Sequence, residues 1–324
     1  MAKAKKEKME ANPFKLKKEL PLLPGYIIVV LWTAFIFCMI GWIILASLST
    51  TKEIFTGSLL ASGLHFENYT KALFTNKAAL NLLNSVIYTV PSCILIIVVC
   101  APAAYCMSRF KFRGAGLIQA LIIIGLAIPN IMIVMPLFSI VSALNLSGTH
   151  FTLIFLYTAC SVPYTTFFLL TFFKGISPSF EEAAAIDGCG PIQCFWKIMF
   201  PLAQPAIVTV SIFNFIGKWN EYFMALIFAN KSNLRPIGVG LYQTVTSMMN
   251  SGDWAGMFAS VVIVFIPTVV IYAFLSDKII SGVTAGGNKG SLFRGEEIPN
   301  QWNFILLALA LHIILGWAVM RHSL

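Results

Sequence analysis

Seven apolar runs, separated by clusters of charged residues, Gly and Pro, dominate this sequence. Each run reaches or nearly reaches the ~20 residues with which an α-helix crosses the hydrocarbon core of a bilayer. Apolar and polar residues do not alternate within the runs, which favours membrane helices over the strands of a membrane barrel. The sequence therefore predicts an all-α protein, a polytopic transmembrane helical bundle. The runs cover about residues 26–48, 82–106, 117–142, 151–173, 206–229, 257–276 and 303–320.

The composition leads to the same fold class. Of the 324 residues, 58% are hydrophobic and only 11% are charged, whereas roughly a quarter of the residues in a soluble domain are charged. A chain with so little charge must expose much of its surface to lipid.

The Lys and Arg residues predict the orientation of the chain. If residues 1–25 form a cytoplasmic basic segment, fifteen Lys and Arg fall on the cytoplasmic side and six on the opposite side. This bias satisfies the positive-inside rule. The net charge of +9 is then explained by topology, and we expect no nucleic-acid partner. The Lys-rich N-terminus can also contact anionic lipid headgroups.

The sequence carries no motif of a catalytic, cofactor or metal site. No G-x-x-x-x-G-K-[ST], H-E-x-x-H or G-x-S-x-G pattern occurs, and none of the seven Cys belongs to a C-x-x-C pair. Isolated Cys in apolar helices usually act as small hydrophobic residues. We therefore expect a protein that is not an enzyme, that binds neither cofactor nor metal, and that cannot bind and hydrolyse ATP by itself.

The connector between the fourth and fifth runs, residues 177–205, is polar and helix-forming. Ser179, followed three residues later by Glu182, is typical of a capping box, and the acidic pair of Glu181 and Glu182 suits the positive end of a helix. Gly188 lies where this helix must end, because glycine adopts the left-handed conformation that other residues avoid. The 177–205 segment thus begins with a short predicted helix and a sharp turn.

A second helix is predicted from Pro191 to Pro201. Its apolar residues recur at helical spacing, and they are Ile192, Phe195, Trp196 and Met199. Phe195 and Trp196 are large enough to fill pockets on a partner protein. Such a helix pair can instead lie on lipid headgroups, but the two acids and the glycine turn favour docking to a protein.

The residues of this segment resemble the EAA loop of permease subunits in binding-protein-dependent ABC importers. The resemblance rests on Glu181-Glu182-Ala183-Ala184-x-Ile186-Asp187-Gly188 and on Ile198-x-x-Pro201-Leu202-x-x-Pro205. The Ile-Asp-Gly form is similar to that of the carbohydrate-uptake branch, the maltose-type permeases. Two further matches to that branch follow in order, Trp219-Asn220-Glu221-Tyr222 and Gly282-x-Thr284-Ala285-Gly286-Gly287-x-Lys289-Gly290, the latter similar to the C-terminus of its second permease.

The resemblance covers about residues 20–290 and implies an ABC importer transmembrane permease domain over residues 26–290, with six core spans. It implies that the chain forms half of the pathway for uptake of a sugar or oligosaccharide across a bacterial cell membrane. The implied partners are a second homologous permease subunit, two cytoplasmic ABC ATPase subunits and an extracytoplasmic sugar-binding protein. The implied ATPase-coupling residues are Glu181, Glu182, Ala183, Ala184, Asp187, Gly188 and Phe195.

Polar and aromatic residues of the fifth run are candidates for the substrate pathway, because amides, acids and aromatic faces suit a ligand rich in hydroxyl groups. Lys218 and Glu221, which are three residues apart on a helix, can instead neutralise each other. The candidates are Asn220, Glu221, Trp219, Tyr222 and Asn214, with Gln243 in the following connector.

The alternative function is a secondary transporter or channel without an ATPase partner. Such proteins use ionisable groups inside the membrane as relays or ion sites. In this chain only Lys218 and Glu221 lie well inside a run, apart from His312 in the last one. No inverted repeat is evident, and the importer reading is favoured.

Residues 291–324 depart from the family pattern as an atypical C-terminal linker and apolar helix. A genuine extra span, a fused peptide and a separately assigned helix remain three alternatives. The last run is marginal, with ~18 residues and a histidine at its centre.

We predict that truncation after Gly290 preserves assembly with the ATPase subunits and sugar uptake, because the family pattern ends there. Co-purification with the ATPase subunits and uptake into membrane vesicles measure the two properties. A truncated chain that fails to assemble would show that residues 291–324 are an integral part of the transporter.

Overall fold

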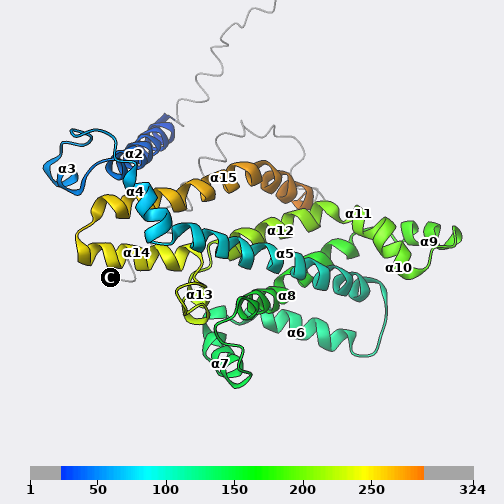
Figure 1. The fold of residues 1–324 in the computed structure, drawn as a ribbon. Helices are drawn as coiled ribbons and strands as arrows, with labels where there is room; N and C mark the ends of the chain where they lie inside the picture. Colours follow the sequence, from blue (N-terminus) through cyan, green and yellow to red (C-terminus); the bar gives the residue numbers. More distant parts are fainter. Residues whose placement is uncertain (1–22, 288–324) are drawn as a thin grey trace, which may run out of the picture. The chain divides into compact units, whose positions relative to one another are not determined.

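Every regular element of the part that the structure describes, residues 23–287, is a helix (Figure 1). The structure is a computed structural model. The predicted all-α fold is confirmed. The chain divides between Leu45 and Ala46 into two units, and the first contributes residues 23–45 of helix α2 (Leu23–Ser47). Most of the predicted basic N-terminal segment, and the whole of residues 291–324, lie outside the described residues.

Four of the described helices are long and apolar enough to cross a membrane. They confirm the first, second, fourth and sixth apolar runs as helices. Two further pairs of bent helices raise the number to six if each pair is one span. The four long helices are α2, α5 (Ala78–Arg109), α8 (His150–Lys174) and α15 (Trp254–Gly287).

The third apolar run is not one straight helix. It forms α6 (Ala115–Ala127) and α7 (Asn130–Ala143), which are bent by 108°. The break lies at Ile128 and Pro129, because proline lacks an N–H group and pushes the residue before it into an extended conformation. Gly125 on α6 lies so close to α8 that a Cβ would stand 2.9 Å from Pro163 Cγ.

The fifth apolar run is also broken, which corrects the prediction of one continuous helix over residues 206–229. Helix α12 (Gln204–Trp219) ends at Trp219, and the short helix α13 (Phe223–Phe228) follows. The polar stretch after α13 contains another helix, α14 (Ile237–Ser251).

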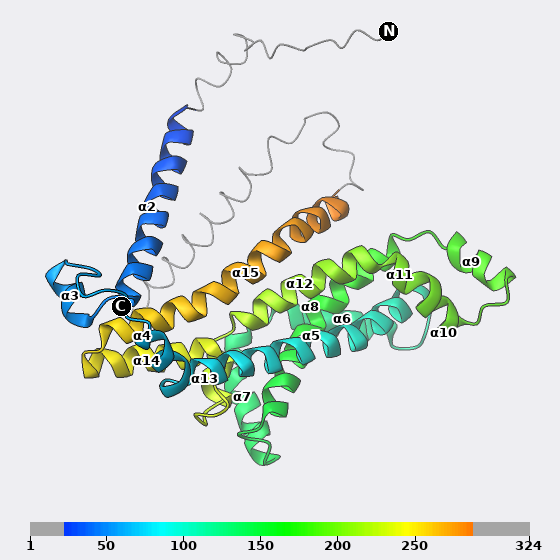
Figure 2. The ribbon, with the colours of Figure 1, turned by 45° about the horizontal axis from the view of Figure 1, so that its top comes forward.

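Helix α5 is the common neighbour of these elements. It packs along α8 and also contacts α12, α14 and α15 (Figure 2). At ~1.5 Å per residue its 32 residues extend over ~48 Å, which exceeds the ~30 Å hydrocarbon core. Helix α5 is therefore longer than a straight crossing of the apolar layer requires.

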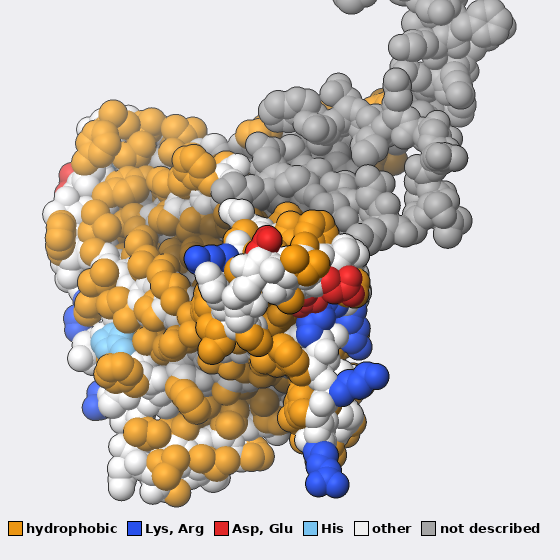
Figure 3. Space-filling model, turned by 90° about the vertical axis from the view of Figure 1, so that its right-hand side faces the viewer, with side chains coloured by type: hydrophobic (Ala, Val, Ile, Leu, Met, Phe, Trp, Pro, Cys, Tyr) orange, Lys and Arg blue, Asp and Glu red, His pale blue; other side chains and the backbone are white. Residues whose placement is uncertain are grey.

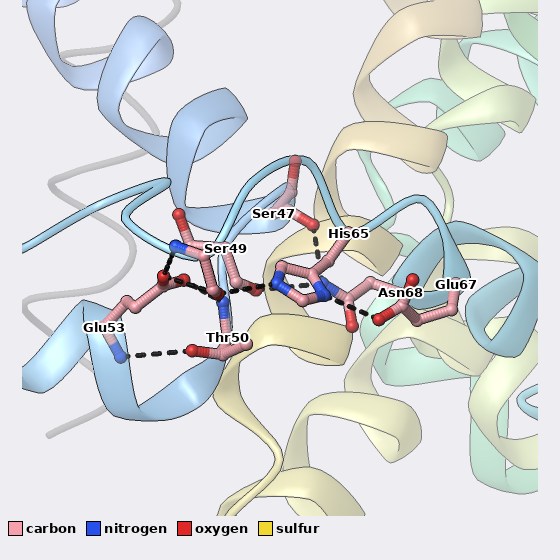
Figure 4. A network of polar contacts seen from close by, with 8 residues as sticks. Ser47, Ser49, Thr50, Glu53, His65, Glu67 and Asn68 are labelled. Atoms are coloured by element: carbon pink, nitrogen blue, oxygen red, sulfur yellow. Dashed lines mark hydrogen bonds and ion pairs between the residues drawn. The ribbon is translucent and has the colours of Figure 1, made fainter.

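The connector between α2 and α5 is organised around a buried carboxylate. Glu53, in the first turn of α3 (Thr51–Thr56), is only 6% exposed. Its carboxylate accepts hydrogen bonds from the Thr50 N–H (2.8 Å), the Ser62 N–H (2.5 Å) and the Ser62 hydroxyl (2.7 Å). The Thr50 side chain in turn accepts from the Glu53 N–H, which completes a capping box (Figure 4).

This polar network continues through His65. Its Nε2 atom lies 2.9 Å from the Ser62 hydroxyl, and its Nδ1 atom lies 2.6 Å from the carboxylate of the largely exposed Glu67 (Figure 4). Three donors on the Glu53 carboxylate, led by the Thr50 N–H, lower the pKa of Glu53 to about 2.

The same connector is fixed to the start of α15. The Ala255 N–H donates to the Thr51 hydroxyl at 3.3 Å, and the rings of Phe55 and Trp254 meet edge to face, 5.7 Å apart. Lys71 also forms an ion pair with Asp253. Residues on both sides of α5 in the sequence are thereby held together.

We predict that Glu53→Gln lowers the thermal unfolding midpoint at neutral pH, because an amide cannot accept all three hydrogen bonds. The lowered pKa means that the ionised carboxylate stabilises the fold fully above the ordinary pKa of 4.5, and that this contribution is lost as the pH falls through about 2. The difference between wild type and variant should shrink over that range. Unfolding of the purified protein in detergent, followed at several pH values, measures it.

Glu67→Gln is the matched control, because its carboxylate is 72% exposed and it should change the midpoint less. Equal midpoints for wild type and Glu53→Gln at pH 7 would contradict the prediction.

Candidate functional site

The 177–205 segment begins with α9 (Ser179–Ile186) and turns sharply at Gly188. Gly188 has a φ of +80°, and the Cys189 N–H donates to the Ala184 carbonyl at 2.9 Å across the turn. This confirms the predicted glycine stop, because a side chain at this φ would clash with its own backbone. A Cβ at Gly188 would meet nothing within 4 Å, so the constraint lies in the backbone and not in packing.

The predicted capping box at the start of α9 is wrong. The cap position is occupied by Pro178, and no side chain caps the helix. Ser179, the expected cap, is the first residue of the helix, and its N–H donates to the Ser177 hydroxyl. Proline supplies a preset φ at this position but no side-chain acceptor.

The second half of the segment starts at Pro191 as predicted. It runs through α10 (Pro191–Cys194), the π-helical turn η3 (Phe195–Met199) and α11 (Phe200–Leu202). The expectation that Pro201 stops this helix is wrong, because Pro201 lies near the start of α11, where its missing N–H is tolerated. The chain instead bends by 72° between Leu202 and Gln204, where α12 begins.

Phe195 holds the segment onto the helix bundle. It is only 5% exposed, and its ring lies 5.1 Å from that of Tyr105 on α5 and 6.5 Å from that of Phe173 on α8. Ala184 is buried in the same cluster. The expectation that Phe195 fills a pocket on a partner is therefore corrected, since its side chain is already enclosed by this chain.

Other residues of the segment remain exposed at this end of the bundle. Ile186 is 87% exposed and Ile192 is 78% exposed, although both are large and apolar. Figure 3 shows acidic and basic side chains beside a largely hydrophobic surface on this face. Apolar side chains that protrude near charged groups are typical of a protein interaction site. The exposed members of the segment include Phe180, Glu182, Ala183, Ile186, Asp187, Ile192 and Trp196.

Glu181 does not face outward with Glu182. Its carboxylate forms an ion pair with Arg109 at the end of α5, with 2.6 Å between Nε and Oε2. The guanidinium also donates from Nη2 to the Ile176 carbonyl at 2.8 Å. Sequence reasoning missed Arg109, because it is far from Glu181 in the chain and no periodicity relates the two.

At the break after α12, the carboxylate of Glu221 accepts three hydrogen bonds from within the protein. Its Oε1 accepts from the Met224 N–H (2.7 Å), and its Oε2 accepts from the Ala225 N–H (3.0 Å) and the Tyr157 hydroxyl (2.8 Å). Glu221 thus satisfies free N–H groups at the start of α13. The alternative pairing with Lys218 is not formed as an ion pair, and Lys218 Nζ instead lies over the Tyr157 ring, 5.3 Å from its centroid.

Two further pathway candidates are internal. Asn214 is buried, and its amide donates to the Thr165 hydroxyl on α8 at 2.9 Å. Trp219 is also buried, and its indole N–H donates to the Thr268 hydroxyl on α15 at 3.2 Å. These bonds join α12 to α8 and to α15.

Asn220 and Tyr222 are the candidates that the break leaves accessible. Asn220 is exposed, and its amide donates to the Ile216 carbonyl at 3.0 Å while its side-chain oxygen receives no hydrogen bond among the described residues. Tyr222 is partly exposed, and its ring lies 5.8 Å from that of Tyr242 on α14, which is 56% exposed. Gln243 follows Tyr242 and is half-buried. Sequence reasoning missed Tyr242, since no sequence pattern relates it to Tyr222, whose ring it contacts.

Comparison with solved structures gives an independent view of the fold. The crystal structure of a bacterial ABC transporter involved in the import of the acidic polysaccharide alginate contains a chain that superposes with a TM-score of 0.67. The two chains are 24% identical, and the match covers 79% of this chain and 96% of the other.

Comparison with characterised sequences finds permease proteins. The chain is 30% identical to the diacetylchitobiose uptake system permease protein NgcG of Streptomyces coelicolor, over 81% of this chain and 87% of that protein. It is 31% identical to the trehalose/maltose transport system permease protein MalG of Thermococcus litoralis, over 84% of this chain and 98% of that protein.

Residues 94–285 match the family described as binding-protein-dependent transport system inner membrane component. This range includes the 177–205 segment, the break after α12 and most of the bundle. The chain belongs to this family of ABC importer permeases.

Proposed function

We propose that this chain forms half of a membrane pathway for a disaccharide or a larger oligosaccharide. The relatives named for diacetylchitobiose and for trehalose/maltose support this substrate class. The chain works in the membrane with a second permease subunit, ATPase subunits and a solute-binding protein, and it is not itself an enzyme. The energy of ATP hydrolysis must therefore enter through a protein contact.

The observation that carries the proposal is the exposed face of the 177–205 segment. Its accessible residues combine the two acids Glu182 and Asp187 with protruding apolar side chains such as Ile186 and Trp196. This face is the contact with a cytoplasmic ATPase subunit. The sharp turn at Gly188 fixes the angle between the two halves of that face.

The expected coupling residues divide into two groups by their surroundings. Glu182, Ala183 and Asp187 are exposed and contact the ATPase directly. The other group, which is internal, positions the segment on the bundle through Glu181, Ala184 and Phe195.

The substrate contacts lie at the break after α12. Asn220 offers an accessible amide, and Tyr222 and Tyr242 offer ring faces that suit a sugar. Glu221, Asn214 and Trp219 support this region from within through the hydrogen bonds described above.

We predict that Gly188→Val abolishes most sugar uptake while insertion into the membrane stays near normal. A β-branched residue at a φ of +80° costs roughly 1–2 kcal/mol or more, enough to shift the turn population about tenfold. ATP-dependent uptake into vesicles that contain the partner subunits measures the effect. Gly190→Ala is the matched control, because Gly190 has an ordinary φ of −71° and open space around it.

Normal uptake by the Gly188→Val protein would remove the coupling role of the 177–205 segment. Uptake that proceeds on an ion gradient without ATP would instead support a secondary transporter or channel.

We predict that Asn220→Leu weakens the apparent affinity for the transported sugar by about 2- to 10-fold, as expected for the loss of one hydrogen bond. The stimulation of ATP hydrolysis by the loaded binding protein should stay unchanged. The KM of uptake and the rate of ATP hydrolysis are measured on the same vesicles. Asn250→Leu, an exposed amide near the end of α14, is the control, and unchanged kinetics for every sugar would contradict the pathway role of Asn220.

A further inference from the structure

Arg109 links the end of α5 to the stretch of chain that leads from α8 into α9. It is the last residue of α5, and its guanidinium holds the Ile176 carbonyl after α8 and the Glu181 carboxylate in α9. The two side chains are only 13% and 19% exposed. An ion pair so poorly exposed to water is screened little, and removing one partner leaves an uncompensated charge.

The contact is reinforced one turn earlier on α5. The Tyr105 ring packs against Phe195 at 5.1 Å, and its hydroxyl lies beside Glu181 and Cys194. The end of α5 is therefore attached to the first half of the segment through Arg109 and to the second half through Tyr105.

Near its opposite end, α5 is attached to the loop between α13 and α14, which follows the break after α12. Asn84 donates to the Asn233 carbonyl (2.9 Å) and to the Arg235 carbonyl (3.1 Å), and Tyr88 donates to the Leu234 carbonyl at 2.7 Å. These acceptors form the loop between α13 and α14. These three hydrogen bonds hold the loop against α5.

Helix α5 is continuous between the two attachments, even though Pro91 and Pro102 lie inside it. From Tyr88 to Arg109 it extends over ~32 Å at ~1.5 Å per residue. Its packing along α8 supports it over this length. A displacement at one end is carried to the other when both ends are tied by bonds that are costly to break.

We propose that α5 transmits movement of the 177–205 segment to the substrate contacts at the break after α12, and that Arg109 is the positioning residue that joins α5 to the segment. This inference rests on the proposed function. Arg109 contacts Glu181 and the Ile176 carbonyl and belongs to neither the proposed ATPase contact nor the proposed substrate contacts. Its loss should therefore uncouple ATP hydrolysis from transport while leaving each partner bound.

The test uses the full complex in lipid vesicles, with the ATPase subunits and the binding protein present, and measures sugar uptake and ATP hydrolysis together. Arg109→Gln should reduce uptake and raise the ATP hydrolysed per sugar transported by at least about fivefold, the lower range of an allosteric coupling. Arg109→Lys, which keeps the charge, should fall between this variant and wild type. Arg113→Gln is the matched control, because Arg113 is an exposed basic residue in the connector between α5 and α6, and it should resemble wild type.

A second variant tests whether movement is transmitted through the other attachment of α5, at the loop between α13 and α14. Tyr88→Phe removes only the hydroxyl that donates to the Leu234 carbonyl. It should also raise the ATP hydrolysed per sugar, although it lies far from the 177–205 segment. A structural role of Arg109 alone would not predict this effect.

The outcomes separate this inference from the proposed function. If Gly188→Val abolishes uptake while Arg109→Gln and Tyr88→Phe transport with a wild-type ratio of ATP to sugar, the inference is overturned and the proposed function stands. A complex with no ATP-dependent uptake in any variant, wild type included, counts against the proposed function itself.

If Arg109→Gln does not reach the membrane, Glu181→Gln carries the test, because it leaves the bond between Arg109 and the Ile176 carbonyl in place. Failure of both variants to insert would overturn the inference, since the pair would then serve folding and not coupling.

Discussion

The structure depends on one constraint, that backbone N–H and C=O groups in an apolar layer must be bonded within the protein. Continuous helices such as α5 and α8 meet it by themselves. Where a helix breaks, its end leaves backbone groups without partners in the helix, and side chains must form hydrogen bonds with them. The Glu221 carboxylate does so for α13 by accepting two backbone N–H groups and the Tyr157 hydroxyl. A charged residue inside an apolar run thus stabilises the break beside which Asn220 is exposed.

The two proposed functional regions are attached near opposite ends of one helix, α5. Arg109 and Tyr105 hold the 177–205 segment at one end of α5, and Asn84 and Tyr88 hold the loop after α13 near the other. The bonds at both ends involve polar side chains with little exposure, which resist slippage more than apolar packing does. A permease needs such a connection, because ATP is hydrolysed by a partner at a distance from the sugar.

The division of the 177–205 segment into exposed and buried residues changes how its sequence is understood. Neighbouring acids have different surroundings, since Glu182 faces solvent and Glu181 is paired with Arg109. Neighbouring aromatic residues differ in the same way, because Phe195 is buried and Trp196 is 52% exposed. Both lie in the π-helical turn η3, and successive side chains on a helix point in different directions around its axis, so that neighbours in the sequence face different surroundings.

The sequence by itself determined the fold class, the long helices, the glycine turn at Gly188 and the family, because apolar length, backbone conformation and a contiguous motif are local properties. It did not determine the breaks in the third and fifth runs or the start of α9, where Pro178 occupies the cap position and no side chain caps the helix. Only the tertiary structure decided which site residues face outward. Arg109 and Tyr242 became visible only there, because their roles arise from residues that are distant in the chain and adjacent in space.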